Sequence, residues 1–311
     1  MSFPHSYLIT FQDNPRMAAD WVCALVLIVA TIVAFKIISC IHTILTVRYK
    51  RKKPSLVKKN WEKDMVYFYQ FPRRPFTPNI SPFCLKVETF LIHHGIKFEM
   101  TESQMLRSTE GKMPFVELNG KQIPDSQLII LELTKHFNIR ENLNPKQKAQ
   151  DRIISRFLDH ATSPAVYYNK IGTNTSKFVK ALAEEHPLYK FRFVFIPMMY
   201  TYMWQCLNGE GTGRHQPEQI QEILHADLEA LDDFLGDNEW ILGGNEPSLA
   251  DMTLFSHIAG GYHLPYDLPI QELLEEEFPR LIAHHNRMAD RYFPEHNFGR
   301  YKRKNVQKNL I

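Results

Sequence analysis

The chain has 311 residues, of which 44% are hydrophobic and 23% are charged, the balance of an ordinary globular protein. This length is enough for two domains or for one large domain. The formal net charge of +3 is too small to indicate nucleic-acid binding by itself. The cysteines, which are Cys23, Cys40, Cys84 and Cys206, form no CxxC pair. Their scatter argues against a disulfide framework or a zinc site and indicates a reducing compartment.

An apolar segment near the N-terminus is the strongest physical signal. Residues 21–47 read WVCALVLIVATIVAFKIISCIHTILTV, and Lys36 is the only charged residue between Trp21 and Ile41. This stretch reaches the length of about 20 residues that a membrane-spanning helix needs. The alternatives are a buried core helix and a signal peptide, but a signal peptide has a shorter apolar core and carries its charges first. We predict a tail at 1–20 and a transmembrane helix at 21–47.

The charges beside this segment predict its orientation. The preceding charged residues are Asp13, Arg16 and Asp20. A linker at 48–64 follows and is strongly basic, with Arg48, Lys50, Arg51, Lys52, Lys53, Lys58 and Lys59. Since excess Lys and Arg mark the cytosolic side of a span, we expect a single-pass membrane protein whose C-terminal part is cytoplasmic. These short flanks carry no address for a particular membrane.

The next part of the chain predicts a thioredoxin-like domain at 65–140. MVYFYQF at 65–71 is typical of a buried strand, and apolar residues then recur at helical spacing from Cys84 up to Gly95. KFEM predicts a short second strand. Asn119-Gly120 joins two alternating runs in PFVELNGKQI and favours a tight β-hairpin. DSQLIILELTKHF then predicts a helix, which completes the order β-α-β, hairpin, α.

From Pro145 onward the sequence predicts helices alone, in a second domain at 145–295. FRFVFIPMMYTYMWQCL is rich in aromatic residues and methionine, which usually indicates a core helix and less often an apolar ligand pocket. PEQIQEILHADLEALDDFLG predicts an amphipathic helix at 217–235 that Gly236 ends. Ser248 and Asp251 have the spacing of a helix capping box. The basic tail at 296–311 is predicted to be disordered.

These segments, in this order, resemble the glutathione-transferase fold. Ser81-Pro82-Phe83-Cys84 opens the first helix, Met113-Pro114 precedes the hairpin, and Asp125-Ser126 opens the next helix. The capping box at Ser248 lies deep in the all-helical second domain, as it does in that fold. The resemblance covers roughly Trp61 to Phe293. It implies a thioredoxin-like N-terminal domain followed by an all-helical C-terminal domain.

Further segments are similar to one group within this fold. GEGTGRHQPEQI, followed by DLEALDDFLGD, is similar to the failed-axon-connections family, and so is the N-terminal membrane helix. That family is related to the metaxins and includes the cadmium-responsive proteins of nematodes. Arg214 and His215 mark the family, but their residue types suggest no chemistry.

The resemblance implies that Ser81 faces the glutathione sulfur. A hydroxyl donor at the positive end of a helix would stabilise the thiolate. A serine at this position excludes dithiol exchange with Cys84, which we expect to be a small buried hydrophobe. The alternative is that Ser81 is a helix N-cap that touches no ligand. The sequence leaves both roles of Ser81 open.

The other implied glutathione contacts are Lys112, Met113, Pro114, Asp125 and Ser126. Met113 would offer its backbone groups to the cysteinyl part beside a cis-proline, and Lys112 is a candidate for the glycyl carboxylate. Asp125 and Ser126 would bind the γ-glutamyl ammonium and carboxylate, although Asp125 is one carbon shorter than the usual Glu or Gln. Each residue also has a structural alternative: a structural proline, a helix cap or a surface lysine.

We expect no metal site at the paired histidines. His93-His94 and His284-His285 are adjacent on predicted helices, so their side chains point about 100° apart and do not converge on one ion.

Three functions follow from the resemblance. The first is a membrane-anchored, cytosol-facing adaptor of the failed-axon-connections type, acting in axon development or a stress response, with weak or absent enzyme activity. The second is an active glutathione transferase that conjugates glutathione to electrophiles through Ser81. The third is a metaxin-like subunit of an organelle import complex. Glutathione is the expected ligand, protein partners or a homodimer are expected by analogy, and no nucleic acid is expected.

Overall fold

The computed structural model describes residues 15–48, 55–184, 186–296 and 298. Most of the predicted N-terminal tail, residues 49–54 of the basic linker and most of the basic C-terminal tail lie outside the described residues. The chain divides into two compact units, at 1–53 and 54–311.

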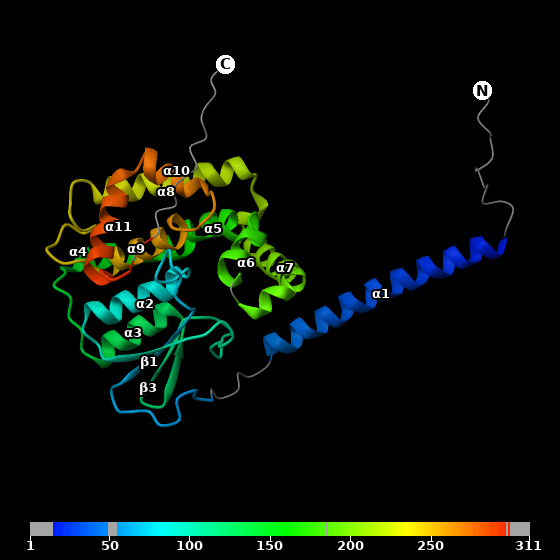
Figure 1. Cartoon of the computed structure of the whole chain (residues 1–311), viewed down its shortest axis with the longest axis horizontal. Helices are drawn as coiled ribbons and strands as arrows, with labels where there is room; N and C mark the ends of the chain where they lie inside the picture. The colour runs from blue at the N-terminus through cyan, green and yellow to red at the C-terminus, as the bar shows by residue number, and fades with distance from the viewer. Residues whose placement is uncertain (1–14, 49–54, 185, 297, 299–311) are drawn as a thin grey trace, which may run out of the picture. The chain divides into compact units, whose positions relative to one another are not determined.

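The described residues of the first unit form one long helix, α1 (Pro15–Arg48) (Figure 1). Its window Asp20–Ile37 has a mean hydropathy of 2.2 and is long and apolar enough to cross a membrane. Length and composition are the only criteria here, and core helices and signal sequences also meet them.

The second unit begins with a mixed four-stranded sheet. Its strands are β1 (Val66–Gln70), β2 (Phe98–Glu102), β3 (Phe115–Leu118) and β4 (Lys121–Pro124), in the order β2-β1-β3-β4. β1 and β2 are parallel because helix α2 (Pro82–His93) crosses between them. Asn119 and Gly120 have φ angles of 50° and 76°, as a two-residue hairpin turn requires, and confirm the predicted hairpin.

Two helices cover the face of the sheet that looks toward the helical domain (Figure 1). These are α2 and α3 (Ser126–His136), which follows the hairpin as predicted. Val66 and Phe68 of β1 pack in one buried cluster with Leu85 of α2 and Phe255 of the helical domain. The two domains therefore share this buried cluster.

The rest of the second unit is helical, as the sequence predicted. Its elements are α4 (Pro145–Phe157), η1 (Leu158–Thr162), α5 (Ser163–Tyr167), η2 (Tyr168–Gly172), α6 (Thr175–Ala183), η3 (Pro187–Phe191), α7 (Arg192–Glu210), η4 (Thr212–Arg214), α8 (Pro217–Leu235), α9 (Leu249–Tyr262), α10 (Pro269–Glu276) and α11 (Pro279–Tyr292). α8 has the predicted bounds and ends at Gly236, where φ is 53°. The thioredoxin-like sheet followed by these helices confirms the predicted fold class.

The predicted capping box fixes the start of α9, the central buried helix. The Asp251 carboxylate accepts hydrogen bonds from the backbone N–H of Ser248 at 2.8 Å and of Ile241 at 2.7 Å. It also lies 2.9 Å from the Ser248 hydroxyl and 2.8 Å from His284 Nε2. Asp251 and the His284 side chain are 0% exposed. Asp251 therefore ties together α9, α11 and the loop before α9.

The suggestion of a core helix at residues 191–207 is wrong. This segment forms η3 and α7, and Leu207 is the only buried residue among those of α7. Phe193 is 70% exposed and Met198 is 62% exposed. The prediction of a core helix failed because α7 has apolar residues on every side, and only one side of this helix faces the core. Met199, Met203 and Trp204 form that inner side.

Replacing Asp251 by alanine should destabilise the whole second unit. The change leaves buried donors of the loop before α9 and of α11 without an acceptor, so we expect the free energy of unfolding to fall by about 3 to 5 kcal/mol. Urea unfolding followed by circular dichroism measures this loss. Asp267→Ala removes an exposed carboxylate and should change stability by less than about 0.5 kcal/mol. Equal effects of the two changes would contradict the role of Asp251.

Candidate active site

Ser81 is the N-cap of α2. Its backbone is extended, with φ −85° and ψ 116°, and its Oγ accepts from the backbone N–H of Cys84 at 3.4 Å. The side chain is half-buried. Capping uses only an acceptor lone pair of the hydroxyl, so its proton can still be donated to a ligand. The N-cap role and the predicted role toward a thiol are therefore compatible.

A buried amide holds the loop in front of Ser81. Asn79 is 0% exposed, and its Oδ1 accepts from the backbone N–H of Ser81 at 2.9 Å. Its Nδ2 donates to Gln70 Oε1 at 3.0 Å and to the carbonyl of Phe71 at 2.8 Å. Gln70 in turn donates to Glu88, which forms an ion pair with Arg73. These contacts fix the loop before Ser81 against β1 and α2. None of them could be predicted from the sequence.

Residues of the helical domain also contact the loop before Ser81. Lys170 of η2 is 2% exposed, and its Nζ donates to the carbonyl of Ile80 at 2.7 Å. Burial lowers the pKa of Lys170 to about 7. Gly260 of α9 lies so close that a Cβ there would be 3.2 Å from the Ile80 carbonyl oxygen and 3.3 Å from Pro82 Cδ. The position of Ser81 therefore depends on both domains.

Cys84 is a buried hydrophobe, as predicted. It is 0% exposed, and burial raises the pKa of its thiol to about 12. The protonated thiol packs in a cluster with Tyr67, Tyr69, Met113 and Phe115. This cluster brings the loop of Met113 to the first turn of α2.

Met113-Pro114 is a cis peptide bond, as the resemblance implied. Met113 lies before β3, which begins at Phe115, so its backbone groups are outside the strand. Lys112 is exposed, and its backbone N–H donates to Ser108 Oγ at 3.3 Å. The Lys112 side chain is thus available at the surface, and its role toward a glycyl carboxylate stays a prediction.

Asp125 has an unusual backbone conformation at the start of α3. Its φ of 71° and ψ of 129° lie where a residue with a side chain is rarely found, a feature that clusters at functional sites. Asp125 Oδ1 caps the helix by accepting from the backbone N–H of Gln127 at 2.9 Å and of Leu128 at 3.2 Å. Oδ2 has no hydrogen-bond partner among the described residues. The hydroxyl of Ser126, a residue only 3% exposed, has none there either.

A buried carboxylate lies beneath these two helix ends. Asp159 Oδ2 accepts from Lys86 Nζ of α2 and from Gln127 Nε2 of α3, both at 2.6 Å. Its Oδ1 lies 3.0 Å from His257 Nε2 of α9. Burial alone would raise the pKa of Asp159, but the hydrogen bond with His257 and the charge of Lys86 lower this pKa overall. This cluster could not be predicted from the sequence, because its members are far apart along the chain.

The arrangement could accept a small anionic thiol peptide. The N-terminal ends of α2 and α3 are positive and favour a thiolate and a carboxylate. The free oxygen of Asp125 suits an ammonium group. Glutathione carries these three groups.

Other residues singled out in the sequence have structural roles. The guanidinium of Arg214 donates twice to the carbonyl of Asn208, at 3.2 and 3.1 Å, and so caps the C-terminal end of α7. His93 contacts the hydroxyl of Tyr292 at 2.6 Å, and His285 lies 2.8 Å from His263. Within the described ranges, no three potential metal ligands come together.

Comparison with known proteins defines the class to which this fold and site belong. Family models of the glutathione S-transferase N-terminal and C-terminal domains match residues 82–177 and 224–288. An isoprene-epoxide glutathione S-transferase from Rhodococcus is 31% identical over 198 residues, which are 58% of this chain and 82% of that enzyme. The chain belongs to the glutathione S-transferase family.

Within this family, the chain is similar to Failed axon connections of Drosophila melanogaster. The two are 33% identical over 260 residues, which are 78% of this chain and 62% of the fly protein. The predicted relationship to that group is confirmed. The chain matches less than two thirds of the fly protein's length.

Solved structures with lower identity share the fold. A glutathione S-transferase of Ceriporiopsis subvermispora in complex with glutathione has a TM-score of 0.53 at 15% identity, covering 73% of this chain and 97% of its own. A β-etherase from Sphingobium has a TM-score of 0.51 at 20% identity, covering 72% and 94%.

The buried lysine behind Ser81 should give stability a measurable pH dependence. Between about pH 7 and 10.5 the unfolded chain keeps a proton on Lys170 that the folded chain releases. The free energy of unfolding should therefore rise with pH in this window, by up to about 1.4 kcal/mol per pH unit. Lys170→Met should reduce this slope in urea titrations, whereas Lys177→Met, at an exposed lysine of α6, should keep it. Parallel slopes for the wild type and Lys170→Met would contradict the assignment.

Proposed function

We propose that this chain is a membrane-tethered glutathione-binding protein. The observation that carries the binding proposal is the left-handed backbone of Asp125. This conformation leaves one carboxylate oxygen of the exposed Asp125 free beside the first turn of α3, where the buried Ser126 has a hydroxyl without a hydrogen-bond partner among the described residues. The relatives that are named or solved as glutathione transferases support the same ligand.

Each part of glutathione has a complementary group in this site. The γ-glutamyl ammonium would pair with Asp125 Oδ2, and its carboxylate would accept from Ser126 and the first turn of α3. The cysteinyl backbone would bond to Met113 before the cis-proline, which would direct the sulfur toward Ser81. Lys112 would reach the glycyl carboxylate.

A transferase activity is the second candidate, and the geometry of Ser81 favours it. The hydroxyl caps α2 as an acceptor and keeps its proton, so it could donate to a thiolate at the positive helix end. Cys84 would take no part because burial keeps its thiol protonated.

A role in axon connections follows from the relative of that name, and we propose it as an adaptor function. A bound glutathione would then serve as a structural or regulatory ligand. The basic linker and α1 support the tether, with α1 crossing the membrane and the second unit in the cytosol.

Glutathione titrated calorimetrically into the full-length chain should bind, and Asp125→Ala should weaken this binding at least about tenfold by removing the ammonium partner. Asp267→Ala, at an exposed carboxylate of the helical domain, should leave the affinity unchanged.

Ser81→Ala separates the two candidate functions. A transferase should lose conjugation of a test electrophile with this change while it still binds glutathione. An adaptor should show no conjugation in either form. The absence of glutathione binding to the wild-type chain at millimolar concentration would refute both.

The orientation of the tether is tested by glycosylation in microsomes. An acceptor tripeptide appended before Met1 should be glycosylated, because the N-terminal tail would be lumenal. The acceptor at Asn174, which is half-buried and donates to the carbonyl of Asn169 at 2.8 Å, should carry no glycan in a cytosolic domain. A glycosidase-sensitive mass shift that Asn174→Gln removes would reverse the topology.

A further inference from the structure

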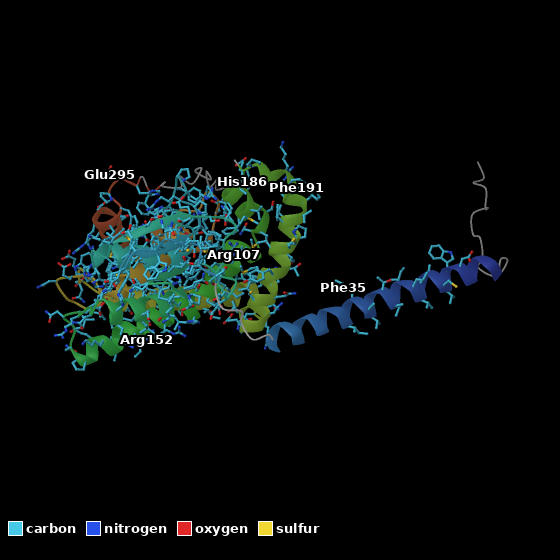
Figure 2. The ribbon with its side chains drawn as sticks, turned by 90° about the horizontal axis from the view of Figure 1, so that it is seen from below. Phe35, Arg107, Arg152, His186, Phe191 and Glu295 are labelled. Carbon is cyan, nitrogen blue, oxygen red and sulfur yellow. The ribbon has the colours of Figure 1, made fainter. Side chains whose placement is uncertain are left out.

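Helix α7 exposes an unusual amount of apolar surface. Phe191, its N-cap, is 52% exposed, and Phe195, Met198 and Tyr202 are 41%, 62% and 51% exposed. Figure 2 shows Phe191 and His186 close together at one end of this helix, on the surface of the domain. Contiguous apolar surface of this kind marks an interaction site.

Four of the exposed apolar residues form one stripe, whereas Phe193 and Tyr200, which are 70% and 49% exposed, lie outside it. Phe191, Phe195, Met198 and Tyr202 are spaced at i, i+4, i+7 and i+11, so they project from the same side of the helix. Val194, which is 44% exposed, lies at the edge of this stripe. We call these five residues the outer face of α7. The opposite side, with Met199, Met203 and Trp204, packs on the core, so the outer face is not used by the fold.

The formal charges inside the segment 186–209 are all positive, and acidic residues stand just outside it at Glu184 and Glu210. From His186 to Gly209 the sequence contains seven aromatic residues, and its formally charged residues are Lys190 and Arg192, with no Asp or Glu. Neither Lys190 nor Arg192 forms an ion pair with a described residue. Lys177 on the adjacent helix α6 is also exposed. A second copy of the same segment would offer these cations no acidic partner.

We propose that the outer face of α7 docks on the surface of an anionic phospholipid bilayer. Aromatic and methionine side chains would enter the boundary between headgroups and acyl chains, while Lys190 and Arg192 would pair with lipid phosphates. An exposed apolar stripe with basic residues at one end and no acidic residue between its ends is typical of helices that lie in this interface.

If α1 spans a bilayer, the second unit stays tethered close to the surface of that bilayer. Residues 49–65 connect α1 to β1 and extend at most about 60 Å. Docking of α7 would then be intramolecular and would need little intrinsic affinity.

The test uses the full-length chain in nanodiscs that hold one copy each. Hydrogen exchange of the α7 amides is compared in discs of phosphatidylcholine alone and of phosphatidylcholine with phosphatidylserine. We expect exchange to be slower by about tenfold or more in the anionic discs, because docking suppresses local opening, and we expect added salt to reduce this protection.

The double variant Phe195→Glu, Met198→Glu should lose the protection in the anionic discs. Both side chains are exposed, so the fold should survive. The matched control is Ile153→Glu on α4, which alters a side chain that is 67% exposed and should keep the protection.

Equal exchange of the wild-type chain in both kinds of single-copy disc would overturn the proposal. Slower exchange of the α7 amides that appears only in discs with two copies of the chain would also overturn the proposal. The outer face of α7 would then be an interface between two copies of the protein. Glutathione binding does not depend on either result.

Discussion

One buried carboxylate joins the two domains of the second unit. Asp159 of η1 binds Lys86 of α2, Gln127 of α3 and His257 of α9. A charge removed from water costs several kcal/mol unless its partners compensate for it, so Asp159 is stable only where all three helices meet. α2 and α3 are also the helices whose first turns carry Ser81 and Asp125. The contact that fixes the domains relative to each other thus fixes the distance between the two ends of the candidate site.

The fold could be predicted where short segments carry their own signals. Asn119-Gly120 favours one turn geometry whatever surrounds it, and Gly236 ends α8 where the apolar period stops. Ser248 and Asp251 are three residues apart, so their reciprocal cap is visible in the sequence. α7 could not be predicted in the same way. This helix has apolar residues on every side. Contacts with helices far away in the sequence determine which of its sides is packed against the core.

In the candidate site, too, some residues could be predicted from the sequence and others could not. Ser81, the cis-proline and Asp125-Ser126 lie at positions that a family resemblance can supply one by one. Lys170 and Asn79 could not be found, because nothing near them in the sequence distinguishes a buried lysine or amide from a surface one. Their importance comes from contacts with the residues beside Ser81, and those contacts exist only in the folded chain.

The close approach of Gly260 and Lys170 to the turn before α2 has a consequence for biosynthesis. A ribosome releases the N-terminal part first, so the sheet with α2 and α3 leaves the exit tunnel long before α9. During that interval the strands can pair. The Ile80 carbonyl, however, does not yet accept its hydrogen bond from Lys170, and Pro82 does not yet pack against α9. The nascent chain therefore has the complete thioredoxin-like sequence without a finished candidate site, and the turn before α2 gains its last contacts only when α9 docks.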